Sequence, residues 1–302
     1  MTTPLPEIRK QSRSSSRPAL DLSVSSNLYL TDQQGRWFEE VMEDPKYKQS
    51  VADALDGGEN ALLHLLERTK LRALHRRITV VDCGPASFQE SIRKLQKLLR
   101  TVIIAQYVVI DMNAHLLSKI KDRVIVTLGV PTTFIQSRFE DLTHDSLADV
   151  AAEETLLLFG STEMNYEPDE LADVLRNFCA PGTLLAFEGL LHTDDDFSAG
   201  YRSAAVERFA FGPLWLLGSN KEQFDFNPTV HDERIILEFI AKEHIDFGIV
   251  GYPFLNAGDT VWTAFSRRPT IAQHKESLAL IADRIDTLTL DPRIMSSLGR
   301  LR

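Results

Sequence analysis

Continuous apolar segments alternate with segments of helical periodicity along most of the chain. The apolar segments predict strands that are buried on both faces, and they cover 78–82, 107–111, 124–128, 155–159, 183–187, 247–251 and 261–265. Between them, apolar residues recur at helical spacing in 88–100, 114–121 and 168–178. Strands and helices that alternate in this way predict a doubly wound α/β sheet with right-handed crossovers.

The last two predicted strands differ from the others. Only residues 252–260 join the segment 245–251 to 261–265, and this linker contains Pro253, Asn256 and Gly258. The linker is too short for a helical crossover, so we expect an antiparallel hairpin. A parallel sheet that ends in such a hairpin is typical of the class I methyltransferase fold, a Rossmann-like α/β architecture.

The composition of the remaining segments predicts a second, smaller and mostly helical substrate or lid domain. Residues 1–24 are rich in Ser, Pro and Arg, as in disordered tails, although a transit peptide has a similar composition. The insertion after the fifth strand is rich in aromatic residues. We therefore expect a disordered tail at 1–24, the N-terminal helical part of the substrate domain at 25–76, the methyltransferase core at 77–190 and 241–268, an insertion completing the substrate domain at 191–240, and a C-terminal helical extension at 269–302.

Composition and charge exclude several classes of function. The 302 residues carry a formal net charge of −10, which argues against a nucleic-acid partner. No apolar run reaches the roughly 18 residues that span a bilayer, and no secretory signal is evident, so we expect no membrane partner and a cytoplasmic location. The two cysteines and the scattered histidines show no metal-ligand spacing, and we expect no metal.

The segment Asp82-Cys83-Gly84-Pro85-Ala86-Ser87 lies between a predicted strand and a predicted helix. Ligands of open α/β sheets bind beyond the carboxyl ends of strands, where small residues let the backbone approach. Because the turn has one glycine instead of GxGxxG, it suits a cofactor without phosphates, such as S-adenosylmethionine (SAM), better than a dinucleotide. We expect Asp82, Gly84, Ala86 and Ser87 to bind the cofactor. The alternative is a plain tight turn.

Two acidic residues further along the chain are candidates for binding the same cofactor. Asp111 ends a predicted strand. Its carboxylate could accept hydrogen bonds from both hydroxyls of a ribose, or it could cap the helix that follows. Phe139 and Glu140 could hold an adenine ring and its amino group, or Glu140 could be a solvated loop acid. Gly84 and Asp111 together favour an adenosine ligand.

The segment Gly160-Ser161-Thr162-Glu163-Met164-Asn165 follows another predicted strand. Its position predicts that Gly160 and Ser161 border the cofactor. Asn165 offers an amide donor and a carbonyl acceptor to a substrate.

These motifs resemble the histidine-specific, SAM-dependent methyltransferase family, which includes the ergothioneine-pathway L-histidine Nα-methyltransferase and fungal dimethylallyltryptophan N-methyltransferases. The similarity covers about residues 27–268. The G-S-T-x-G-N signature of the family is similar to 160–165, and its E-L-G-S-G turn is similar to 82–86. The resemblance implies SAM as cofactor. It also implies that Asn165, Tyr47 and Tyr201 contact the substrate.

Three departures from the family pattern bear on the substrate. Met164 replaces the glycine before the asparagine, and Val261 and Thr263 stand by position where the histidine enzymes have an acid and a serine. Without the acid, a buried imidazole N–H would be left unpaired at a cost of about 1–3 kcal/mol. The resemblance therefore implies a substrate other than histidine.

The sequence as a whole predicts an SAM-dependent N-methyltransferase that acts on a small-molecule amine or amino-acid-like metabolite. The alternative is a methyltransferase-like partner protein that binds the cofactor but is catalytically inactive. A nicotinamide-dependent oxidoreductase is disfavoured by the single-glycine turn and the terminal hairpin. The segment 269–302 is expected to pack on the domain or on a second subunit, which would form a homodimer.

Overall fold

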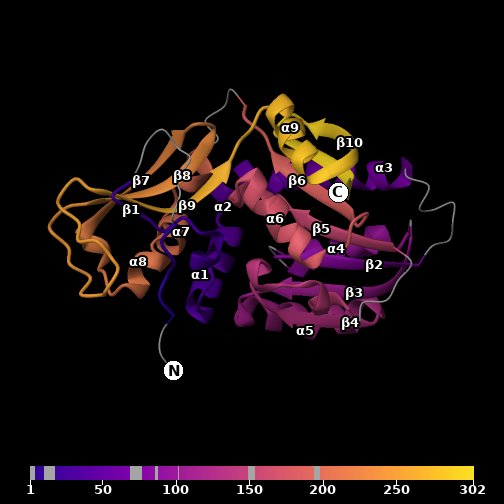
Figure 1. Ribbon diagram of the computed structural model, residues 1–302, viewed down its shortest axis with the longest axis horizontal. Coiled ribbons are helices and arrows are strands. Elements are labelled where there is room, and N and C mark those ends of the chain that lie inside the picture. The colour runs from indigo at the N-terminus through magenta and orange to yellow at the C-terminus, as the bar shows by residue number, and fades with distance from the viewer. Residues whose placement is uncertain are drawn as a thin grey trace. The chain divides into compact units, whose positions relative to one another are not determined.

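The computed structural model divides the chain into two compact units, which Figure 1 shows as a ribbon. The first unit consists of Met1–Val51 and Asp194–Arg268, and the second of Ala52–Thr193 and Pro269–Arg302. The structure describes residues 4–9, 18–68, 77–85, 88–100, 102–148, 154–193 and 198–302.

The second unit contains a seven-stranded sheet in the order β10-β11-β6-β5-β2-β3-β4. The strands are β2 (Arg77–Cys83), β3 (Ile103–Asp111), β4 (Thr132–Gln136), β5 (Glu154–Gly160), β6 (Leu184–Leu190), β10 (Ala282–Asp291) and β11 (Ile294–Leu301). Neighbouring strands from β4 to β6 are parallel, whereas β11 is antiparallel to both β6 and β10. This is the predicted class I methyltransferase sheet with an antiparallel terminal hairpin.

Helices cover both faces of this sheet, because the strand residues that point to either face are apolar. Val80 and Val109 pack with the helices α3, α4 and α5, whereas Val81 and Val108 pack with α6 and α9. The helices are α3 (Asp53–Arg68), α4 (Phe88–Leu98), α5 (Ala114–Leu128), α6 (Pro168–Phe178) and α9 (Ile271–Ile281), with short 3₁₀ helices η4 (Phe139–Asp141), η5 (His144–Leu147) and η6 (Ser161–Asn165).

The first unit contains a four-stranded sheet in the order β1-β9-β8-β7, which the sequence pattern did not reveal. Its strands are β1 (Leu20–Asp21), β7 (Phe224–His231), β8 (Arg234–Ala241) and β9 (Thr260–Arg267). Its helices are α1 (Asp32–Glu43), α2 (Pro45–Tyr47), α7 (Ala204–Ala210) and α8 (Gly212–Leu216), with short helices η1 (Ser25–Leu28), η2 (Lys48–Ala52, a π-helix), η7 (Ala199–Tyr201) and η8 (Lys221–Gln223). Phe38 of α1 packs its ring 5.4 Å from that of Phe209 of α7.

The prediction of which residues form the terminal hairpin was wrong. Residues 247–251 form no strand, and 261–265 lie in β9, which pairs with β8 in the first unit. The predicted core segment 241–268 therefore belongs to the first unit. The hairpin of the large sheet is β10–β11, inside a segment expected to be helical, where only α9 is a helix. The edge strand β10 has polar, exposed residues on it, and so it lacks the continuous apolar run of a buried strand.

Two further local predictions were wrong. Residues 124–128 were predicted as a strand because they form a continuous apolar run, but they are the last turn of α5. Gly129 ends this helix in the left-handed conformation with φ +62°, and the strand comes later, as β4. Within the predicted tail, Leu20 and Asp21 pair with β9. Residues 1–3 and 10–17 of the tail lie outside the described residues.

Candidate functional site

Those predicted cofactor residues that the structure describes end, or directly follow, strands at the carboxyl edge of the large sheet. Parallel pairing places the ends of β2, β3 and β5 at one edge. The Gly84 N–H donates to Ile110 O at 2.9 Å, which ties the turn after β2 to β3. The Ser137 N–H donates to Asp111 O at 3.2 Å, which ties the segment after β4 to the same strand.

The turn after β2 brings its backbone close to two other segments. Gly84 has φ +65°, a conformation that glycine adopts without strain. A Cβ atom at Gly84 would lie 3.4 Å from the Phe139 ring and 3.4 Å from Thr162 Oγ1. Asp82 is buried and accepts a 2.7 Å hydrogen bond from the Tyr107 hydroxyl. Gly84, Phe139 and Thr162 are therefore neighbours, whereas Ala86 and Ser87 lie outside the described residues.

Asp111 is a buried carboxyl at the end of β3. Its Oδ1 accepts the Asn113 N–H at 2.8 Å, and Asn113 itself caps α5. Burial raises the pKa of Asp111 from 3.8 to about 7, although the Asn113 N–H lowers it and the charge of Asp82 raises it further. Among the described residues, no hydroxyl or cation hydrogen-bonds to this carboxyl, so it can still accept hydrogen bonds from a ligand.

Phe139 and Glu140 follow β4 and face the same edge. The Phe139 ring packs 5.2 Å from the Phe159 ring. Glu140 Oε1 accepts a 2.9 Å hydrogen bond from the Tyr166 hydroxyl, and Arg138 Nε lies 3.7 Å from Glu140 Oε2. Burial, and then the charge of Glu140, raise the pKa of the Tyr166 hydroxyl, which therefore stays a hydrogen-bond donor to that carboxylate. Glu140 is thus held in place, which a freely solvated loop acid would not be.

The turn after β5 carries Gly160, Ser161 and Asn165. Gly160 has φ +53° and ψ −141°, a conformation that side chains rarely tolerate. Ser161 and Asn165 are partly exposed, whereas Met164 is fully buried in the core. Met164 is therefore a core residue, whereas the Asn165 side chain is partly accessible.

We expect Gly160→Ala to lower the free energy of unfolding by about 1–2 kcal/mol, because the backbone conformation disfavours a Cβ atom. The new Cβ would also lie 3.5 Å from Glu188 Oε2. Urea unfolding measures the change. Gly129→Asn is the control, because asparagine tolerates the left-handed conformation at φ +62° and nothing lies within 4 Å there. Equal stability of Gly160→Ala and the wild type would contradict the strain argument.

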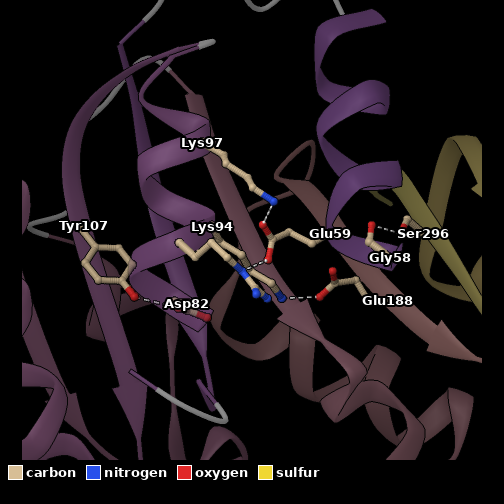
Figure 2. A network of polar contacts seen from close by, with 9 residues as sticks. Gly58, Glu59, Asp82, Lys94, Lys97, Tyr107, Glu188 and Ser296 are labelled. Carbon is tan, nitrogen blue, oxygen red and sulfur yellow. Dashed lines mark hydrogen bonds and ion pairs between the residues drawn. The ribbon is translucent and has the colours of Figure 1, made fainter. Parts of the chain in front are cut away.

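Ion pairs around two buried carboxylates, which the sequence pattern did not reveal, are shown in Figure 2. One of these carboxylates, Glu188, lies beside the Gly160 turn. Glu188 of β6 and Glu59 of α3 are each 1% exposed. Lys94 of α4 forms an ion pair with Glu188, and Glu59 pairs with Lys97 and, at 2.9 Å, with Arg93. The only signal in the sequence was a lone acid in the otherwise apolar strand 184–190.

The predicted substrate tyrosines lie together in the first unit. The rings of Tyr47 and Tyr201 are 5.6 Å apart and nearly perpendicular, at 80°. The Tyr201 hydroxyl accepts a 2.5 Å hydrogen bond from Arg268 Nη2. The sequence pattern did not single out Arg268, which directly follows Arg267, the last residue of β9.

The described residues contain no group of three or more His, Cys, Asp or Glu side chains arranged to hold a metal ion. In the same part of the chain, none of the helices combines the length and apolar character that crossing a membrane requires.

Comparisons with known proteins identify the family. The profile of the histidine-specific, SAM-dependent methyltransferases matches residues 17–211, more than half of the chain. No curated protein sequence matched. Among solved structures, the DhpI–SAH complex has a TM-score of 0.45 and 12% identity over 89% of this chain and 95% of its own.

Two other solved structures have similar scores. The PH0226 protein from Pyrococcus horikoshii has a TM-score of 0.46 and 11% identity over 86% of this chain and 100% of its own. Human N-acetylserotonin methyltransferase with SAM has a TM-score of 0.42 and 10% identity over 85% of this chain and 55% of its own. The strand order and the family profile lead to one conclusion: the chain belongs to the histidine-specific methyltransferase family and is an SAM-dependent enzyme.

Proposed function

We propose that the chain methylates a nitrogen of a small amine or amino-acid-like metabolite other than histidine. The observation that carries this proposal lies in β9. Val261 and Thr263, which the family resemblance places where the histidine enzymes have an acid and a serine, are both 0% exposed. The Thr263 hydroxyl already donates to Leu237 O at 3.2 Å. Neither side chain can therefore bind an imidazole in this conformation.

The residues at the carboxyl edge of the large sheet fit SAM. Asp111 has acceptor capacity for the ribose hydroxyls, and Glu140 Oε2 for the adenine amino group. The turn at Gly84 offers backbone without a side chain, as a close-lying ligand requires. No phosphate group has to be accommodated, which suits the single glycine of this turn. When bound, SAM supplies an electrophilic methyl group.

The contribution of the chain is to hold a neutral amine in line with that methyl group and to exclude water. We assign the orientation of the amine to Asn165, Tyr47 and Tyr201, because these side chains offer donors and acceptors and the family resemblance places the substrate there. The amine must lose its proton before attack. We assign no obligatory general base, since solvent can take this proton.

A panel of amines and L-amino acids that includes L-histidine tests the proposal. We expect S-adenosylhomocysteine (SAH) to form with at least one non-histidine acceptor at a higher kcat/KM than with L-histidine. Preference for L-histidine would contradict the substrate assignment. SAM binding by calorimetry without transfer to any acceptor would instead favour the inactive, cofactor-binding partner protein.

Asn165→Ala tests the role of the substrate amide. We expect KM for the best acceptor to rise about fivefold to tenfold, the effect of losing one hydrogen bond. The affinity for SAH should stay unchanged, as measured by calorimetry. Ser219→Ala, a change in the first unit outside the assigned residues, is the control for KM. An unchanged KM in Asn165→Ala would exclude Asn165 from the acceptor site.

A further inference from the structure

A buried pair of titratable side chains joins the C-terminal extension to the turn after β5. His274 of α9 is 0% exposed, and Glu163 of η6 is 1% exposed. The His274 Nε2 atom lies 3.6 Å from Glu163 Oε1. An imidazole and a carboxylate at this distance attract each other, most strongly when the imidazole is protonated. The pair therefore links α9 to a turn that carries an assigned acceptor residue, Asn165.

A glycine in β6 gives the His274 ring a closely fitting position. A Cβ atom at Gly189 would lie 2.5 Å from His274 Cε1 and 2.6 Å from His274 Nε2, which is closer than side-chain atoms approach one another. The imidazole can lie against the strand only because position 189 has no side chain. Since protein interiors are close-packed, a ring held in this way has little freedom to move away from Glu163.

The turn that contains Glu163 has a buried side and an accessible side. Glu163 and Met164 are buried, whereas Ser161 and Asn165 are partly exposed. The turn is one short 3₁₀ helix, η6, whose own hydrogen-bond geometry is poor, so its buried side chains contribute much to its position. A buried carboxylate is costly unless a polar partner stays close to it, which restricts Glu163 to a narrow range of positions. A restraint on Glu163 is therefore also a restraint on Asn165, two residues further along.

We propose that His274 is a positioning residue for the methyl-transfer reaction, which holds Glu163 and thereby fixes the turn that presents Asn165 to the methyl acceptor. This inference rests on the proposed function, which assigns Asn165 to the acceptor. It adds a residue that lies outside the segment 17–211 matched by the family profile. The C-terminal extension then contributes to the acceptor site from beneath, through the buried side of the turn.

Glutamine at either position tests the link, because it keeps a polar side chain but removes the imidazole or the carboxylate. For the best acceptor of the panel, we expect His274→Gln and Glu163→Gln each to raise KM about threefold to tenfold, whereas kcat should change less than about twofold. Gly189→Ala should raise KM likewise, because the new Cβ atom displaces the His274 ring while both partners stay intact. The affinity for SAH, measured by calorimetry, should be the same in all variants.

A double-mutant cycle and a control variant separate positioning from a general loss of stability. In the Asn165→Ala background, His274→Gln should raise KM no further, because it acts through a side chain that is already absent. Arg176→Gln is the control. Arg176 Nη2 donates to Leu280 O of α9 at 3.0 Å, so this variant removes another contact of the helix and should leave KM unchanged. Partial unfolding alone would lower kcat but not raise KM. Amide hydrogen exchange in 161–166 should be faster in His274→Gln than in Arg176→Gln.

The outcomes distinguish this inference from the proposed function. If the folded members of the set His274→Gln, Glu163→Gln and Gly189→Ala keep the wild-type KM, the inference is overturned and the proposed function stands. The same holds if His274→Gln raises KM further in the Asn165→Ala background, or if Arg176→Gln raises KM as much as His274→Gln does. If SAH binds but no acceptor of the panel is methylated, the proposed function is overturned, and the inference with it.

Discussion

Lys94→Met should lower the free energy of unfolding by about 3 kcal/mol, the lower end of the range for breaking a buried ion pair. Glu188 is 1% exposed, and Lys94 is its only described ion-pair partner. The variant leaves a buried carboxylate without a counter-ion, next to the Gly160 turn. The lower end of the range applies because the Lys94 side chain itself is 21% exposed. Urea or thermal unfolding measures the loss.

A neighbouring lysine provides a matched control for this variant. Lys97→Met should cost less than 1 kcal/mol, because Glu59 keeps Arg93 as a partner at 2.9 Å. Removing the carboxylate charge as well, in Lys94→Met with Glu188→Gln, should recover more than half of the loss, because position 188 then buries no unpaired charge. If Lys94→Met and Lys97→Met lose the same stability, the pair with Glu188 has no special role.

The sequence predicted the central strands of the large sheet because burial on both faces leaves a continuous apolar run. The segments 78–82, 107–111 and 155–159 lie in strands of this sheet, as does 183–187 apart from its first residue. A strand that is buried on both faces is apolar along its whole length, so it can be identified from its own segment of the sequence.

Strands at the sheet edge and the ends of helices were harder to predict, because contacts with neighbouring elements determine their conformation. The strand β10 lies at the exposed edge of the sheet and carries polar residues such as Asp283 and Asp286. It therefore has no continuous apolar run, and its few apolar residues fell at a spacing that also fits a helix. In 124–128, the continuous apolar run favoured a strand, but the segment continues α5 to its cap at Gly129. Local propensity was overridden by tertiary context in both places.

The positions of the candidate cofactor residues followed from the rule that ligands bind at the carboxyl ends of parallel strands. Gly84, Asp111 and Gly160 indeed end neighbouring strands or start the turns after them. Partners far apart in sequence could not be predicted in this way. Glu188 with Lys94, and Tyr201 with Arg268, meet only through the fold, and no local spacing records such contacts.

Asp111→Asn should lower the affinity for SAH at pH 8 at least tenfold, on the order of 1.4 kcal/mol, because a ribose would lose one of its acceptors. The effect should depend on pH, since the pKa of Asp111 is about 7 before ligand binds. Ribose hydroxyls donate to the ionised carboxylate. The wild-type affinity should therefore fall as the pH drops below 7, approaching tenfold per pH unit, whereas the Asn variant should show no such dependence. Calorimetry between pH 5.5 and 8.5 measures both.

The same variant should be more stable than the wild type at high pH. Because the pKa of Asp111 is raised in the folded state, its contribution to stability is fully present below pH 3.8 and is lost as the pH rises to about 7. Asparagine does not ionise and avoids this loss, so its melting temperature should exceed that of the wild type at pH 8 but not at pH 4. Asp173→Asn, at an exposed carboxyl of α6, is the control and should change neither quantity. A pH-independent wild-type affinity, or an Asn variant that binds SAH as tightly as the wild type at pH 8, would exclude Asp111 from the cofactor site.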